Sequence, residues 1–188
     1  MTRRGRESAL DVNVAGLLAE GPASHRDILV HDLLLPLDDE LELARPVDGT
    51  VRLARTNRGL LVTGHLRAAL RETCSRCLRE IDVPIEIEID EEALPSIDLT
   101  SGLPVDTSQD PEAVRLTDHH ELDLEPLIRE AISLAEPIAS LCRPDCPGLC
   151  AVCGEDLAIG DHAHEDSPVD PRLEALRALR VDDDGGNG

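Results

Sequence analysis

Four of the six cysteines are crowded into the segment CRPDCPGLCAVCG, and the other two form a Cys-x-x-Cys pair in ETCSRCLREI upstream. Zinc prefers four thiolate or imidazole ligands in a tetrahedron, and a two-residue gap lets one turn supply two of them. We therefore predict a structural zinc site, because paired cysteines in a cytosolic chain indicate metal ligands before disulfides. The candidate ligands are Cys74, Cys77, Cys142, Cys146, Cys150 and Cys153.

Spacing alone leaves three ligand sets open. The upstream pair can join Cys150 and Cys153, or it can join Cys142 and Cys146. The third set uses only the four cysteines of residues 142–153. Gly154 follows the last cysteine, where a tight knuckle favours a positive φ, whereas the upstream CSRCL has no such glycine.

No catalytic residue is predicted. A thioredoxin-like role needs a Cys-x-x-Cys at the start of a helix that follows a strand, but Cys74 lies between two predicted strands. The set also lacks the three-ligand composition of a catalytic zinc and the His-Glu-x-x-His spacing of metalloproteases. Four histidines in polar loops are expected to be solvated: His119, His120, His162 and His164.

The composition predicts an unusual core. The chain has 188 residues, of which 41% are hydrophobic, yet it contains no Phe, Tyr or Trp and only one Met. The core must therefore consist of Leu, Ile, Val and Ala, without the large buried areas that aromatic side chains contribute. A small aliphatic core benefits from a metal staple.

Charge is distributed unevenly along the chain. The net charge is −21, and lysine is absent. Between residues 45 and 80, however, eight arginines stand against three acids, a local charge of +5. This clustering predicts a face for RNA phosphates or an acidic partner. Its candidate residues are Arg52, Arg55, Arg58, Arg67, Arg71, Arg76 and Arg79.

No targeting or membrane segment is predicted. The basic start MTRRGRES is followed by an apolar run of residues 14–19 only, shorter than the roughly 7–15 residues of a secretory core. No stretch approaches the roughly 20 apolar residues of a membrane span. We expect a cytoplasmic protein with no membrane contact and no small-molecule substrate.

The elements predict an α+β fold in a single domain of residues 9–181, between disordered arms at 1–8 and 182–188. Residues 9–92 are rich in strand alternation, with turn signals at Asp48-Gly49 and at residues 57–59. In EIDVPIEIEIDE the isoleucines and Val83 share one face, and Pro84 favours an edge position or a bulge. The strands should form an antiparallel β-meander, either a sheet or a partly closed barrel.

The C-terminal half predicts fewer strands. Residues 93–120 form a predicted loop, and helical spacing then spans residues 121–137, strongest near 123–136, with Asp123 as N-cap. A cysteine-rich knuckle loop at 138–160 follows. VDPRLEALRALR predicts a terminal helix at 170–180, capped by Asp170 with Pro171 in its first turn.

The chain resembles the YceD-like large ribosomal RNA subunit accumulation proteins through three motifs that occur in the same order. They are CSRCL, LDLEPLIREAISLAEPIASLCRPDCPGLCAVCGEDL and VDPRLEALRAL. The resemblance covers roughly residues 10–180 and is strong from Leu60 onward. The matching motif positions are Cys74, Arg76, Cys77 and Leu78, then Cys142, Cys146, Gly148, Leu149, Cys150, Cys153 and Gly154, and finally Asp170, Pro171 and Arg172.

The resemblance implies a bacterial cytosolic factor needed for large-subunit ribosomal RNA to be processed or to accumulate, with no established catalytic chemistry. Three functional hypotheses follow, and they are given from the most to the least favoured. The first is an assembly factor that contacts structured ribosomal RNA through the arginines. The second is a zinc-stabilised module that binds a ribosomal protein or assembly factor, and the third is a metal-dependent RNA-processing enzyme. Stacking of single-stranded bases is not expected, because the chain has no aromatic residue.

Overall fold

The computed structural model describes residues 10–37, 41–98, 101–106 and 113–160, together with His164 and Arg172. The predicted arms at 1–8 and 182–188 lie outside these residues, as does the predicted terminal helix 170–180 apart from Arg172. No helix in the described part of the chain is long and apolar enough to cross a membrane.

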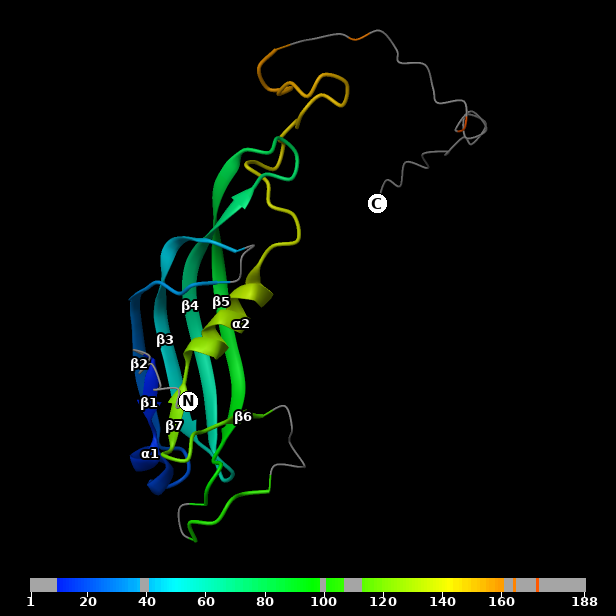
Figure 1. Cartoon of the computed structure of the whole chain (residues 1–188). Helices are drawn as coiled ribbons and strands as arrows, with labels where there is room; N and C mark the ends of the chain where they lie inside the picture. The colour runs from blue at the N-terminus through cyan, green and yellow to red at the C-terminus, as the bar shows by residue number, and fades with distance from the viewer. Residues whose placement is uncertain are drawn as a thin grey trace, which may run out of the picture.

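One curved sheet dominates the molecule (Figure 1). Its strands follow the order β2-β3-β4-β5-β6, and the sheet does not close on itself. Strands β2 to β5 form the predicted antiparallel meander, whereas β6 pairs with β5 in parallel. The strands are β2 (His25–Leu33), β3 (Leu43–Arg55), β4 (Leu60–Thr73), β5 (Glu80–Leu94) and β6 (Val114–Arg115).

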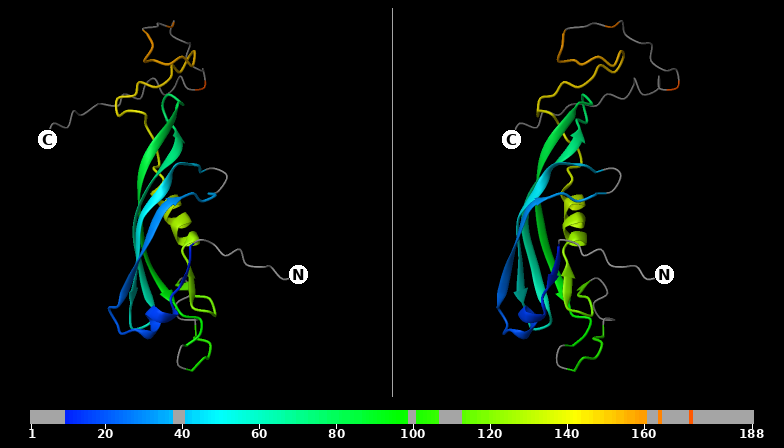
Figure 2. Two further views of the ribbon diagram at one scale, coloured as in Figure 1. Left: turned by 90° about the vertical axis from the view of Figure 1, so that its left-hand side faces the viewer. Right: turned by 60° about the vertical axis from the view of Figure 1, so that its left-hand side comes forward.

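A second layer covers one face of this sheet (Figure 2). It contains the antiparallel pair β1 (Asp11–Asn13) and β7 (Glu121–Asp123) and the helix α2 (Glu125–Ala135). The short helix α1 (Ala15–Ala19) follows β1 and buries Leu17 and Leu18. The opposite face of the sheet carries no covering element in the described part of the chain (Figure 2).

Two predicted boundaries in the C-terminal half are wrong. The helix does not begin at residue 121, because residues 121–123 pair with β1 through the Val12–Leu122 register. Leu124 is the N-cap of α2, although the Asp123 carboxylate accepts the N–H of Glu125 at 2.9 Å. The predicted loop 93–120 also contains β6, and β5 extends into it as far as Leu94.

The predicted turn at Asp48-Gly49 is also wrong, because both residues lie inside β3. The register of β3 against β4 shifts between Arg45 and Asp48, so the local signal marks a bulge. A Cβ on Gly49 would lie 2.3 Å from the carbonyl oxygen of His65. The glycine therefore allows β3 and β4 to approach each other closely.

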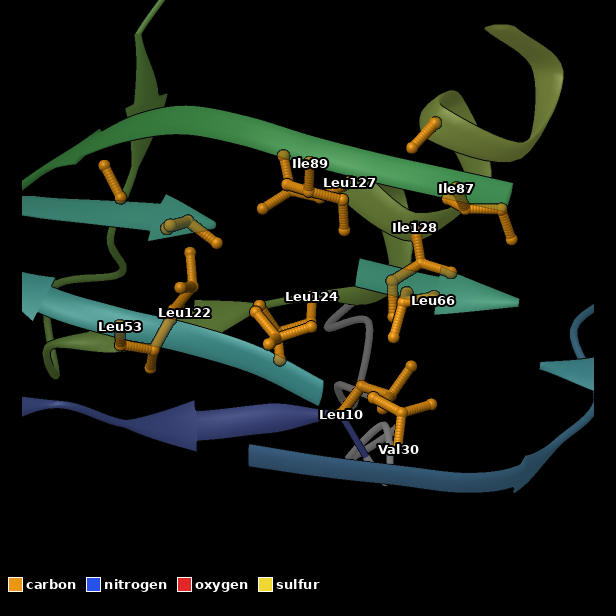
Figure 3. Close-up of a cluster of buried hydrophobic side chains, with 14 of the residues drawn as sticks. Leu10, Val30, Leu53, Leu66, Ile87, Ile89, Leu122, Leu124, Leu127 and Ile128 are labelled. Carbon is orange, nitrogen blue, oxygen red and sulfur yellow. The ribbon is translucent and has the colours of Figure 1, made fainter. Parts of the chain in front are cut away.

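The core is aliphatic, as predicted (Figure 3). Leu53 and Leu66 from the sheet meet Leu124 and Ile128 from the covering layer, and every member of the cluster is Leu, Ile, Val or Ala. Along β5 the isoleucines at 85, 87 and 89 are buried and the acids between them are exposed, which confirms the predicted alternation. Pro84 pairs with β4 on one side, and β6 reaches only the far end of β5.

The hairpin of β4 and β5 carries the upstream cysteine pair at its tip. After α2 the chain runs back to the same end of the molecule and brings the cysteine-rich segment beside the hairpin (Figure 1). The result is a second, smaller cluster of buried residues, separate from the aliphatic core. It contains Cys74, Cys77 and Cys146, with Ile81, Leu141 and Leu149 packed against it.

Candidate metal centre

The first knuckle, residues 74–79, is the tight connection between β4 and β5. The N–H of Cys74 donates to the carbonyl of Arg79 at 2.8 Å, and the N–H of Leu78 donates to the carbonyl of Cys74 at 2.9 Å. This ring requires a positive φ at Leu78, which has φ +57°. It turns the side chains of Cys74 and Cys77 to the same side.

Four thiols meet at this knuckle. The Sγ atoms of Cys74, Cys77, Cys142 and Cys146 all lie within 4.8 Å of one another. Cys74 Sγ is 3.9 Å from Cys146 Sγ, and Cys77 Sγ is 3.7 Å from Cys142 Sγ. A zinc tetrahedron with Zn–S bonds of about 2.3 Å has S–S edges of about 3.8 Å. The four thiols therefore fit zinc, and no cysteine of the chain forms a disulfide.

The ligand set that joins the upstream pair to Cys142 and Cys146 is thus the one the structure brings together. The other two sets are not assembled, because the chain after α2 docks on the first knuckle before it reaches Cys150. The N–H of Ser75 donates to the carbonyl of Ser140 at 2.8 Å, which places Cys142 beside Cys74. The N–H of Cys142 then donates to Cys74 Sγ at 3.4 Å.

The protein prepares one thiolate in this cluster. Hydrogen bonds from the backbone N–H groups of Cys77, Cys142 and Arg76 lower the pKa of the Cys74 thiol to about 6. The pKa of Cys142 is raised to about 12, mainly by the hydrogen bond with the Cys146 thiol and to a smaller extent by desolvation. A negative charge on Cys74 is therefore stabilised and one on Cys142 is opposed, and a bound cation would favour the thiolate form of both.

The second knuckle, residues 150–155, repeats the backbone of the first. The N–H of Cys150 donates to the carbonyl of Glu155 at 2.8 Å, and the N–H of Gly154 donates to the carbonyl of Cys150 at 2.9 Å. Gly154 has φ +76°, which confirms the role predicted for this glycine. Leu78 holds the equivalent position in the first knuckle.

Two of the predicted arginines join the knuckles together. Arg76 donates through Nη1 to the carbonyl of Cys146 at 2.9 Å, and its own carbonyl accepts the N–H of Leu149 at 3.1 Å. Arg79 forms an ion pair with Asp156 at 2.8 Å. The pKa of Asp156 is lowered by the N–H of Ala158 and by Arg79. These arginines therefore have a structural role in the cysteine end.

His164 is exposed, as expected for a solvated histidine, but it also lies against the second knuckle. Its Nε2 is 3.2 Å from Cys150 Sγ, and with Cys153 it forms a second group of metal-ligand atoms. Sequence reasoning missed this contact because no motif in the sequence links His164 to Cys150 and Cys153. His119 and His120 join no metal-ligand group among the described residues, and His162 lies outside them.

The remaining arginines do not share one face. Arg52, Arg67 and Arg71 lie on the outer face of the sheet, where cross-strand partners are acidic. Arg52 bonds both carboxylate oxygens of Asp27 at 2.7 and 3.0 Å, and Arg67 lies 3.8 Å from Glu86. The ion pairs of Arg71 are with Glu42 at 3.5 Å and Asp82 at 3.8 Å.

Arg55 and Arg58 lie at the opposite end of the sheet from the knuckles. Arg55 donates to the carbonyls of Leu18 and Gly59, each at 3.1 Å, and so ties α1 to the β3–β4 hairpin. Arg58 is 3.8 Å from Glu92. The register of the meander thus divides the seven arginines among three places, and each contacts an acid or a backbone carbonyl.

The part of the chain that carries this geometry matches a known protein family. The family model of the large ribosomal RNA subunit accumulation protein YceD matches residues 62–180. The chain belongs to this family. The YceD match begins within β4 and includes both knuckles and all six cysteines.

Relatives occur in mycobacteria. Proteins of Mycobacterium bovis and Mycobacterium tuberculosis, both named as uncharacterized, are 33% identical over 130 residues, which is 69% of this chain. A Mycobacterium leprae protein, likewise named, is 31% identical over 132 residues. The chain spans 58–60% of the length of these curated relatives. No solved structure matches the chain.

Proposed function

We propose that this protein is a cytoplasmic, non-catalytic factor that supports the processing and accumulation of large-subunit ribosomal RNA during ribosome assembly. The observation that supports the proposal is the YceD match over residues 62–180, whose description names the accumulation of the large ribosomal RNA subunit. The match includes the four-thiol cluster, which we assign to a structural zinc ion. Closed four-thiolate zinc sites contribute folding free energy and leave no position for a substrate.

The zinc ion would act as a staple between two segments that are far apart in the sequence. Cys74 and Cys77 belong to the β4–β5 hairpin, whereas Cys142 and Cys146 follow α2. Only a few aliphatic side chains pack around the thiols, namely Ile81, Leu141 and Leu149. Such a small cluster cannot hold two chain segments by burial alone, so the metal must supply much of the stability of this end.

We infer that the contact with the pre-ribosomal particle is made to a basic ribosomal protein. By cross-strand register, the outer face of the sheet presents four arginines, at positions 45, 52, 67 and 71, against eight acids, which gives a net charge of −4. The acids are Asp27, Asp48, Glu80, Asp82, Glu86, Glu88, Asp90 and Glu92. Arginines that already pair with carboxylates are poor ligands for phosphates, and the acidic surplus repels RNA. A lysine- and arginine-rich protein surface complements this face.

The pathway is tested in a strain from which the gene has been deleted. We expect a fall in the ratio of large-subunit to small-subunit ribosomal RNA, measured on total RNA, and its recovery with the wild-type gene. The Cys146→Ser variant should recover it poorly, because it removes a buried ligand, whereas the exposed Ser101→Ala variant should recover it fully. An unchanged ratio in the deletion strain would overturn the proposal.

The mode of contact is tested by capture of the tagged protein from lysate with and without RNase. A ribosomal protein retained after RNase treatment supports direct protein binding, and reversal of Glu86 and Glu88 to lysine should abolish it. Loss of all partners on RNase treatment would favour direct RNA contact. Cleavage of precursor RNA by the purified, zinc-loaded protein would instead establish the enzyme hypothesis.

A further inference from the structure

A second cluster of metal-ligand side chains lies beyond the four-thiol site. The Sγ atoms of Cys150 and Cys153 and a ring nitrogen of His164 all lie within 4.8 Å of one another. Cys150 Sγ and His164 Nε2 are separated by 3.2 Å. A tetrahedral zinc with bonds of about 2.3 Å to sulfur and 2.05 Å to nitrogen needs about 3.6 Å between these atoms. A shift of a few tenths of an ångström would therefore admit the ion.

The backbone gives independent support, because the second knuckle already has the conformation of the first. Both knuckles close the same pair of hydrogen bonds, from the first cysteine and from the residue after the second cysteine. Both also aim a backbone N–H at the first sulfur. Arg76 supplies it to Cys74, and Val152 supplies it to Cys150 at 3.4 Å. Such N–H groups stabilise the thiolate form that binds a metal.

The two clusters differ in completeness and exposure. The first has four thiols, of which three are buried, whereas the second has three ligand atoms in the described part of the chain and is open to solvent. Two thiolates and one imidazole suit zinc, and three protein ligands leave one of its four positions to another donor. An exposed site with fewer protein ligands releases its ion more readily than a closed one.

We propose that Cys150, Cys153 and His164 form a second zinc site, separate from the four-thiolate site, whose ion exchanges readily and accepts one ligand from outside these three residues. That ligand can be water in the isolated protein. In a complex it can be a thiolate, imidazole or carboxylate of a binding partner. The proposal is independent of the role in ribosomal RNA accumulation, since it concerns metal binding by the purified chain.

The first test counts metal ions on the zinc-loaded full chain by native mass spectrometry. We expect two zinc ions in the wild type and one in the Cys150→Ser/Cys153→Ser double variant. The matched control, His119→Ala, should retain two, because His119 is an exposed loop histidine outside both groups. A wild type with only one zinc ion would overturn the proposal, as would two ions in the double variant.

The second test measures exchange with a chromogenic zinc chelator. The wild type should release one ion at least about tenfold faster than the other. His164→Ala should retain the slowly released ion of the four-thiolate site but should abolish stoichiometric zinc binding at the second site. Cobalt substitution keeps the variants interpretable, because the four-thiolate charge-transfer spectrum must persist when the second site is removed. Equal release rates for both ions would contradict an open second site.

Discussion

The two cysteine knuckles share one backbone conformation but have different surroundings. The first lies at the tip of a long hairpin, against Leu141 and Leu149, and meets two further thiols from the chain after α2. The second projects beyond it, with Val152 65% exposed, and meets one imidazole. The comparison shows that a Cys-x-x-Cys turn supplies two potential metal ligands, and the contacts around it determine how many further ligands it meets and how exposed they are.

The largest difference between the knuckles should be in stability. We expect Cys146→Ser to lower the Tm of the zinc-loaded protein by about 6–12 °C, since the loss of a structural zinc ligand costs about 3 kcal/mol and each kcal/mol shifts the Tm by about 2–4 °C in a chain of this size. Cys153→Ser should lower it by no more than about 2 °C. Differential scanning calorimetry measures both, and equal losses would remove the distinction between a closed and an open site.

A smaller effect concerns two glycines, one that precedes the second knuckle and one inside it. Gly148 and Gly154 both have positive φ, at +81° and +76°, so alanine is strained at either position. At Gly148 a Cβ would also lie 3.1 Å from the carbonyl of Arg76, while at Gly154 it meets open space. Gly148→Ala should therefore cost about 2 kcal/mol and Gly154→Ala about 1 kcal/mol in urea unfolding. The reverse order would show that the knuckles are not packed together as described.

The ion pair between Arg79 and Asp156 offers a way to separate the knuckles. We expect Arg79→Gln to cost less than about 1 kcal/mol, because the arginine is largely exposed. Amide hydrogen exchange should nevertheless quicken at Leu157, whose N–H bonds to the carbonyl of Gly148. Arg67→Gln, which removes an exposed pair on the sheet, is the control and should leave this exchange unchanged.

The smallest expected effect is a gain in stability. Leu78 occupies at φ +57° the position that Gly154 holds in the other knuckle, and its side chain is 64% exposed. Leu78→Gly should relieve backbone strain at little loss of packing and stabilise the zinc-loaded protein by about 0.5 kcal/mol. The converse change, Gly154→Leu, should destabilise it by about 1 kcal/mol. A marked loss of stability in Leu78→Gly would mean that the leucine contributes packing that its exposure does not indicate.

Much of the fold could be predicted because its signals are local. The alternation at residues 81–89, the aliphatic core and the helical stripe of α2 each follow from residue order alone. The wrong predictions lie at positions where the pairing partner of a segment determines its secondary structure. Residues 121–123 continue a helical pattern, yet they pair with β1, and Asp48-Gly49 carries a turn signal inside a strand. Tertiary pairing overrides local propensity at such positions.

The sequence by itself determined that the six cysteines have the spacing of metal ligands and that the core is aliphatic, because spacing and side-chain chemistry are properties of short segments. Only the tertiary structure decided which cysteines meet. It placed Cys142 and Cys146 beside the first knuckle, left Cys150 and Cys153 with His164, and divided the arginines among acids and backbone carbonyls. Those outcomes depend on strand register and on the path of the chain after α2, which bring together residues that are distant in the sequence.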